Sequence, residues 1–173
     1  MTAKCEGRII AILHVPQDMI LSGVLESLKK CGARIRSASL ETRRIVASLP
    51  ARKKCIEALT RQAREGVRLR IEVTVKCRIG GLPGRCLETL GPTRLVRGPR
   101  SILYIGRLGG RIVLVEAARE RVTIKVGRET GTLPGPVVPP SLLALDISEL
   151  EAALKLALRL GSELYDCAQG ISG

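Results

Sequence analysis

Alternating apolar and polar positions give the clearest structural signal in this chain. In Val67–Lys76 (VRLRIEVTVK) every odd position is apolar and every even position is polar, which is the period of a strand with one buried face. Arg8–Val15 (RIIAILHV) is almost continuously apolar and predicts a more deeply buried strand. Residues 34–40 and 43–49 are separated by the polar pair Glu41–Thr42 and predict a hairpin.

Two segments between these strands have the period of a helix. From 17 to 31, apolar residues fall at positions 20, 21, 24, 25 and 28, and Gly32 follows at the expected end. A second helix is expected from about Pro50 to Glu65, where Gly66 stops it. The order of elements over residues 1–76 is therefore β-α-β-β-α-β, which predicts a ferredoxin-like lobe.

The second half of the chain has a different character. Residues 77–100 are rich in glycine, proline and arginine and predict a basic loop with one short helix at about 84–90. The remaining elements predicted for the lobe 101–173 are strands at 101–105, 111–117 and 121–126, a linker at 130–140 and a helix at 148–164. The expected fold class is α+β, with a β-rich second half closed by a C-terminal helix.

Charge narrows the choice of partner. The chain has 29 basic and 16 acidic residues, a net charge of +13, and 21 of the basic residues are arginine. Residues 1–76 carry 16 basic and 7 acidic side chains and residues 77–145 carry 11 and 4, whereas residues 146–173 carry 2 and 5. Residues 1–145 together therefore carry a net charge of +16, which favours a polyanionic partner. We expect RNA, either tRNA or rRNA, and a protein partner at the acidic C-terminal helix.

The amino-acid composition restricts how such a partner is recognised. The chain has no Phe or Trp and only two Tyr, so a module that stacks bases on aromatic rings is disfavoured. Recognition of backbone and shape by arginine is favoured instead. The absence of asparagine, the scarcity of glutamine and the abundance of arginine are typical of a thermophile or of a GC-rich genome.

The candidate nucleic-acid contacts are basic residues of the predicted hairpin and of the Gly/Pro-rich segments. Glycine and proline allow a backbone to approach a ligand closely, although the same side chains would also suit a solvated surface. The candidates are Arg34, Arg36, Arg43, Arg44, Arg78, Arg85, Arg94, Arg97, Arg100 and Arg107.

No catalytic residue, metal site or cofactor site can be assigned from the residues themselves. The six cysteines form no CxxC pair and His14 is the only histidine, so a zinc site is not expected. We expect the cysteines to be small buried side chains, with disulfides as the alternative if the source is hyperthermophilic. The N-terminus lacks the pattern of a signal peptide and no apolar run is long enough to span a membrane, which predicts a cytoplasmic protein without membrane contact.

The order of elements resembles that of the wybutosine-synthesising tRNA methyltransferase family over about residues 17–164. The stretches that carry the resemblance are DMILSGVLESLKKCG with the hairpin after it, Ile112–Leu133 and Ser148–Leu164. The resemblance implies tRNA as substrate and S-adenosylmethionine as cofactor. The family's Ser-Ser-Cys-Ser-Gly-Arg signature is not preserved at Ser37–Ile45, which implies a divergent member that binds RNA without methylating it.

The sequence therefore predicts a basic RNA-binding protein, related to a tRNA-modification factor. Two alternatives come from other classes of protein. The β-α-β-β-α-β order also fits an ACT-like small-molecule regulatory domain, which has no need of so large a positive charge. A basic subunit of a ribonucleoprotein complex is the other alternative.

Overall fold

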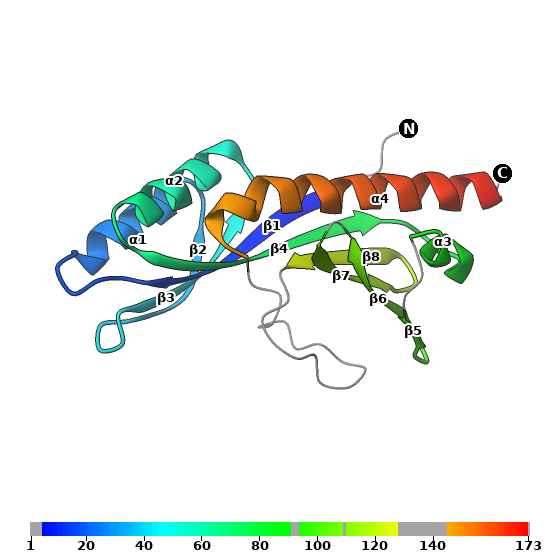
Figure 1. Cartoon of the computed structure of the whole chain (residues 1–173), viewed down its shortest axis with the longest axis horizontal. Coiled ribbons are helices and arrows are strands. Elements are labelled where there is room, and N and C mark those ends of the chain that lie inside the picture. Colours follow the sequence, from blue (N-terminus) through cyan, green and yellow to red (C-terminus); the bar gives the residue numbers. More distant parts are fainter. Residues whose placement is uncertain (1–4, 91–93, 109, 128–144, 173) are drawn as a thin grey trace.

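The fold is α+β, and the ferredoxin-like arrangement predicted for the first half is present. The computed structural model describes residues 5–90, 94–108, 110–127 and 145–172. The linker predicted at 130–140 lies outside these residues. Within them, one antiparallel sheet of eight strands runs through both halves of the chain in the order β2-β3-β1-β4-β8-β7-β6-β5, with helices along one of its faces (Figure 1).

The first six elements follow the predicted order. They are β1 (Cys5–His14), α1 (Leu21–Lys30), β2 (Arg34–Ser39), β3 (Arg44–Pro50), α2 (Lys53–Arg64) and β4 (Arg68–Arg78). The first helix begins four residues later than expected, because residues 16–19 form a turn in which the amide of Met19 donates to the carbonyl of Pro16. Gly32 and Gly66 end the two helices with φ angles of 99° and 108°, a conformation that favours glycine.

The second half adds four strands and two helices. They are α3 (Gly84–Glu88), β5 (Arg94–Arg97), β6 (Ile102–Leu108), β7 (Arg111–Ala117), β8 (Arg121–Gly127) and α4 (Leu150–Ser172), which follows a 3-10 turn at Ile147–Glu149. Two parts of the segment 77–100, expected to be a loop, are strand: Cys77 and Arg78 continue β4, and β5 pairs with β6 at the edge of the sheet.

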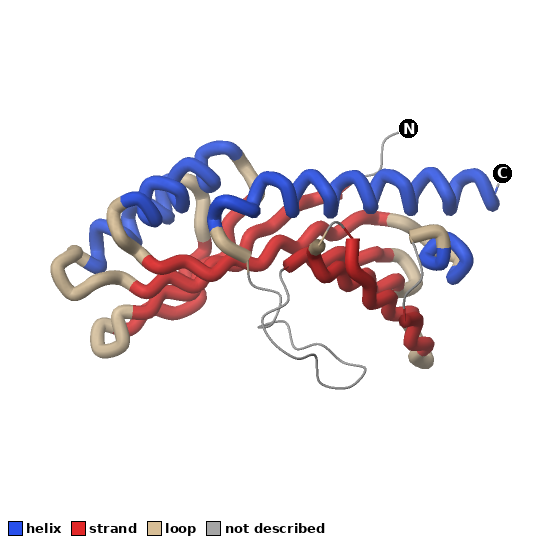
Figure 2. The backbone as a smooth tube through the Cα atoms, in the orientation of Figure 1, coloured by secondary structure: helices blue, strands red, loops and turns tan. Residues whose placement is uncertain are grey.

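The two halves join through β4 and β8. These strands pair from Val73↔Val126 to Arg78↔Arg121, so the sheet is unbroken between the two predicted lobes. The C-terminal helix α4 crosses this junction, and its small and aliphatic side chains Ala153, Ala157 and Leu160 are buried against the sheet. Helix α4 thus covers the seam between the lobes, as Figure 2 shows.

All six cysteines form disulfides. Cys5 pairs with Cys77 between β1 and β4, Cys31 with Cys55 between α1 and α2, and Cys86 with Cys167 between α3 and α4. The expectation of unpaired buried cysteines is therefore wrong, although four of the six are buried. The bonds join segments far apart in sequence, and the unpatterned spacing of the cysteines could not reveal the pairs.

Candidate nucleic-acid interface

The two faces of the sheet differ in what covers them. In β1, the odd-numbered residues Ile9, Ala11 and Leu13 are fully buried, whereas the even-numbered ones are exposed or half-buried. The same alternation continues in β4, where Ile71 and Val73 face the helices. Because directly paired residues of neighbouring strands project to the same side of a sheet, the strand registers extend this division across all eight strands.

The face that no described helix covers carries most of the sheet's charge. We refer to its basic residues as the basic face: Arg8, Arg34, Arg36, Arg44, Arg68, Arg70, Lys76, Arg78, Arg94, Arg107, Arg121 and Lys125. Only Glu6, Glu72 and Glu116 oppose these twelve cations on the same side. The described part of this face therefore has a net charge of +9.

The basic face is concave. One hollow of about 740 Å³ is lined by Arg36 of β2, Arg8 of β1, Lys125 of β8 and Leu103 of β6. Strands β3, β4 and β7 lie between these four strands in the sheet, and β5 lies beside β6 at the edge. Side chains from β2 and β6 can border one hollow only if the sheet curls around it, so the surface could follow a convex ligand.

Some cations at the floor of the hollow are held in place by neighbouring side chains. The Lys125 ammonium lies 3.3 Å from a carboxylate oxygen of Glu72, and Arg8 Nε donates to Ser48 Oγ over 3.0 Å. The outer residues differ, because Arg34, Arg36, Arg44, Arg68 and Arg70 are exposed. Among the described residues, no carboxylate lies within 4.0 Å of these five guanidinium groups. Their charges are therefore available to an anion.

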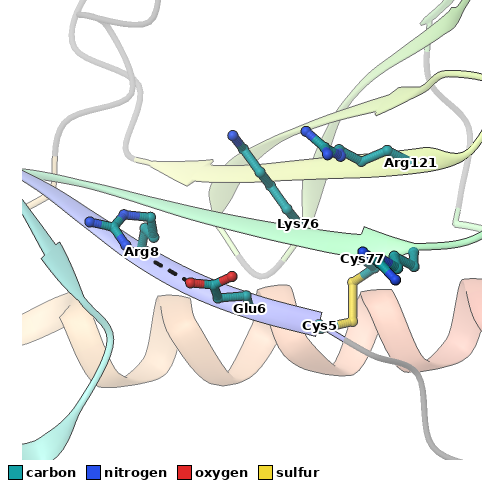
Figure 3. A pocket seen from close by; sticks show the side chains of 7 residues that line it. Cys5, Glu6, Arg8, Lys76, Cys77 and Arg121 are labelled. Carbon is teal, nitrogen blue, oxygen red and sulfur yellow. Dashed lines mark ion pairs between the residues drawn. A yellow bond between two sulfur atoms is a disulfide. The ribbon is translucent and has the colours of Figure 1, made fainter.

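A second hollow lies at one end of the basic face. It has a volume of about 710 Å³ and is lined by Arg8, Lys76, Arg78 and Arg121 together with Glu6 and the Cys5–Cys77 disulfide. Figure 3 shows Lys76 and Arg121 projecting from neighbouring strands on the side away from α4. Four cations and one carboxylate border this hollow, so its charge favours an anion.

The structure brings six of the ten predicted contact residues together on the basic face. They are Arg34, Arg36, Arg44, Arg78, Arg94 and Arg107. The hairpin and the end of β4 supply four of them, and β5 and β6 supply the others.

The other four predicted residues lie elsewhere. Arg43 is in the β2–β3 turn, where its guanidinium donates to the carbonyls of Pro16, at 2.9 Å, and Met19. The Arg97 guanidinium packs near Gly84 of α3, on the helix side of the sheet. Arg85 is an exposed residue of α3, and Arg100 is exposed in the turn after β5.

Six residues of the basic face were not predicted as contacts, namely Arg8, Arg68, Arg70, Lys76, Arg121 and Lys125. The signal for three of them was present in the sequence. The strict alternation of VRLRIEVTVK places Arg68, Arg70 and Lys76 on one side of a strand. What the sequence lacks is which strands lie beside this one and extend its polar side into a larger surface.

The chain's one histidine lies at the surface. His14 is exposed at the end of β1, directly between Arg44 and Arg68 in the strand register, so its side chain is not part of the core. In the described ranges, no group of three His, Cys, Asp or Glu residues could hold a metal ion. No helix among the described residues combines the length and apolarity needed to cross a membrane.

Comparisons with known proteins show no family for this chain. No family model and no curated protein matches it. Solved structures with some similarity include the regulatory subunit of aspartate kinase from Thermus thermophilus, with 13% identity, a TM-score of 0.26 and coverage of 92% of this chain and 99% of that one. The aspartate kinase of Clostridium acetobutylicum matches at 8% identity and a TM-score of 0.28, over 93% of this chain and 34% of that chain.

A third such structure is E. coli aspartokinase III in complex with lysine and aspartate. It has 11% identity and a TM-score of 0.25, and the match covers 92% of this chain and 32% of that chain. Scores this low establish neither a common fold nor a common activity. The resemblance to the wybutosine-synthesising family stays a prediction.

Proposed function

We propose that this protein binds RNA on the basic face of its sheet, chiefly through the phosphates. The observation that carries the proposal is the gathering of twelve cations and only three carboxylates on one uncovered, concave surface. Such a surface gains affinity by displacing the counterions condensed on a polyanion. Exposed arginines without carboxylate partners also match phosphate geometry with two parallel hydrogen bonds.

Folded RNA suits this surface better than an unstructured strand. Tyr104 is fully buried on the helix side of β6 and Tyr165 belongs to α4, so neither tyrosine lies on the basic face, and its one ring is the His14 imidazole. Single-strand binders gain much of their affinity from stacking bases on such rings. A concave basic surface instead recognises backbone and shape, as a tRNA or an rRNA helix would offer.

Charge removal at matched positions tests the proposal. The first variant replaces Arg36, Arg68 and Arg70 by Gln on the basic face. The control replaces Arg52, Arg61 and Arg64 by Gln, which are exposed residues at the start and on the surface of α2, in the opposite layer. We expect the first variant to bind tRNA at least tenfold more weakly than the control in filter binding at ~50 mM salt, where phosphate contacts contribute strongly.

The two proteins have the same net charge, so long-range attraction alone predicts equal losses. Equal losses, or no tRNA binding by the wild type, would reject the basic face as an RNA site. Circular dichroism of both variants verifies that they fold. A DNA hairpin of the same sequence measures the preference for RNA.

An ACT-like small-molecule regulatory domain is the second candidate. The observation that favours it is the β1-α1-β2-β3-α2-β4 order with strand order β2-β3-β1-β4. Fold order alone does not establish function, and a net charge of +9 on one face is not needed to bind an amino acid. Thermal stabilisation by an amino acid together with no affinity for tRNA would favour this candidate.

We further propose that the protein works in the cytoplasm of a thermophile, since intracellular proteins of hyperthermophiles carry disulfides.

We also propose a protein partner at α4. Residues 146–173 carry a net charge of −3, opposite in sign to the rest of the chain. The helix would therefore dock a protein partner, as expected if this chain is a basic subunit of a ribonucleoprotein complex, and a pull-down with α4 variants would test this.

A further inference from the structure

Two arginines face each other at the end of the basic face. Arg78 of β4 and Arg121 of β8 are direct partners in the strand register, and both are exposed. Like charges directly opposite each other in a sheet are destabilising. No carboxylate of the described residues forms an ion pair with either guanidinium. The arrangement costs stability unless an anion binds between the two strands.

Two more cations complete the group. Lys76 lies two residues before Arg78 on the same strand, and Arg8 lines the same hollow from β1. The only acidic residue there is Glu6, whose carboxylate lies 3.9 Å from the Arg8 guanidinium. That pair is exposed and therefore weak. The hollow thus has a net charge of +3 within about 710 Å³.

A disulfide joins two of the strands that carry these cations. Cys77 lies between Lys76 and Arg78 in the sequence, and its disulfide with Cys5 joins β4 to β1 directly beneath the hollow. Figure 3 shows this bond crossing from one strand to the other. A site on strands that are covalently joined loses little conformational entropy when it binds.

We propose that this hollow binds a phosphate group carrying two or more negative charges, as a terminal phosphate or a pyrophosphate does. An internal phosphodiester carries one charge, whereas a terminal phosphate carries about two near neutral pH and matches a site of net charge +3 better. The terminal group could belong to an RNA end or to a free pyrophosphate. The RNA-end version rests on the function proposed above, whereas the phosphate chemistry does not.

Calorimetric titration with inorganic pyrophosphate tests the site without RNA. We expect one pyrophosphate to bind per chain, and the double variant Arg78→Gln/Arg121→Gln to weaken it at least tenfold. The control Arg61→Gln/Arg64→Gln removes the same charge from α2 and should change the affinity by less than threefold. If the wild type does not bind pyrophosphate, or if both double variants weaken it equally, the proposal is wrong.

An RNA hairpin with a 5′-triphosphate or a 5′-hydroxyl distinguishes the two sources. A preference of at least tenfold for the triphosphate in the wild type, lost in Arg78→Gln/Arg121→Gln, assigns the site to RNA ends. Equal affinity for both hairpins, with pyrophosphate still bound, assigns it to a free phosphate compound. Absence of RNA binding with pyrophosphate bound rejects the RNA function but supports the site.

Discussion

Gly161 of α4 lies directly against the sulfur of Cys77. A Cβ atom at position 161 would stand 2.6 Å from Cys77 Sγ and 2.9 Å from Cys5 Sγ. Helix α4 can therefore cross the β1–β4 disulfide only where it has no side chain. The same helix covers the seam at which β4 and β8 join the two halves of the sheet, so this contact sets how closely the helix layer approaches the sheet.

We expect Gly161→Ala to lower the free energy of unfolding by about 1–3 kcal/mol, the usual cost of overpacking. In an open helix the same change would stabilise by about 0.5–1 kcal/mol. Gly170→Ala is the matched control on α4, because a Cβ there meets nothing within 4 Å. Denaturant unfolding measures both variants.

The disulfide provides a second check. In a Cys5→Ala/Cys77→Ala background the sulfurs are gone, and Gly161→Ala should be neutral or stabilising. A penalty that persists without the sulfurs would contradict the contact between Gly161 and the disulfide.

The predictable parts of the fold were those with a local signal. The alternation around Ile71 and the glycine after each of the first two helices fixed the elements of the first half. Pairing between β4 and β8 has no local signal, because alternation shows that a strand has two faces but not which strand lies beside it. For this reason the continuous sheet could not be read from the sequence.

The candidate site was predictable to the same extent. The abundance of arginine and its placement at Arg34 and Arg36 indicated a basic surface in the hairpin. The short strand β5 was missed because it has four residues and follows a Gly/Pro-rich segment. Without that strand, Arg94 and Arg97 looked equivalent, although they lie on opposite faces.

The three disulfides predict that the native protein has no titratable thiol. Ellman's reagent should find none in denaturant before reduction and six after it, since the structure has no free cysteine. Chain-entropy arguments give about 4–5 kcal/mol for closing a loop the size of Cys86–Cys167 and about 3–4 for Cys31–Cys55, whose sequence separations are 81 and 24. The Cys86→Ala/Cys167→Ala variant should therefore lose more free energy of unfolding than the Cys31→Ala/Cys55→Ala variant, because its loop is longer. Thiols found before reduction would contradict the pairing.

Arg43 and Arg44 should differ although they are neighbours. The Arg43 guanidinium donates to two carbonyls of the β1–α1 loop, whereas Arg44 projects from the basic face. We expect Arg43→Gln to cost about 1–2 kcal/mol of stability, as when partly buried acceptors lose a charged donor. Arg44→Gln should leave stability nearly unchanged but weaken tRNA binding more. Thermal unfolding and filter binding separate the two effects, and the reverse order would place Arg43 at the interface.

Arg94 and Arg97 test the faces of the sheet at its far edge. Arg94 pairs with Ile105 on the basic face, whereas the Arg97 guanidinium packs near Gly84 of α3. Arg94→Gln should weaken tRNA binding severalfold more than Arg97→Gln, although each change removes one charge. Similar losses in filter binding would show that the interface does not extend to β5.

Salt dependence provides the last test, because it counts phosphates rather than charges. The logarithm of the tRNA affinity should fall linearly with the logarithm of salt concentration, by about 0.7–0.9 for each phosphate contacted. Removing Arg68 and Arg70 from β4 should make this slope shallower by about 1–2, because both side chains are exposed on the basic face. Removing Arg61 and Arg64 from α2 should lower the affinity slightly and leave the slope unchanged, since distant charges attract RNA without displacing its bound counterions. If both pairs of substitutions reduce the slope equally, RNA contacts the helix layer as well. A slope near zero in the wild type would mean that this face does not bind phosphates.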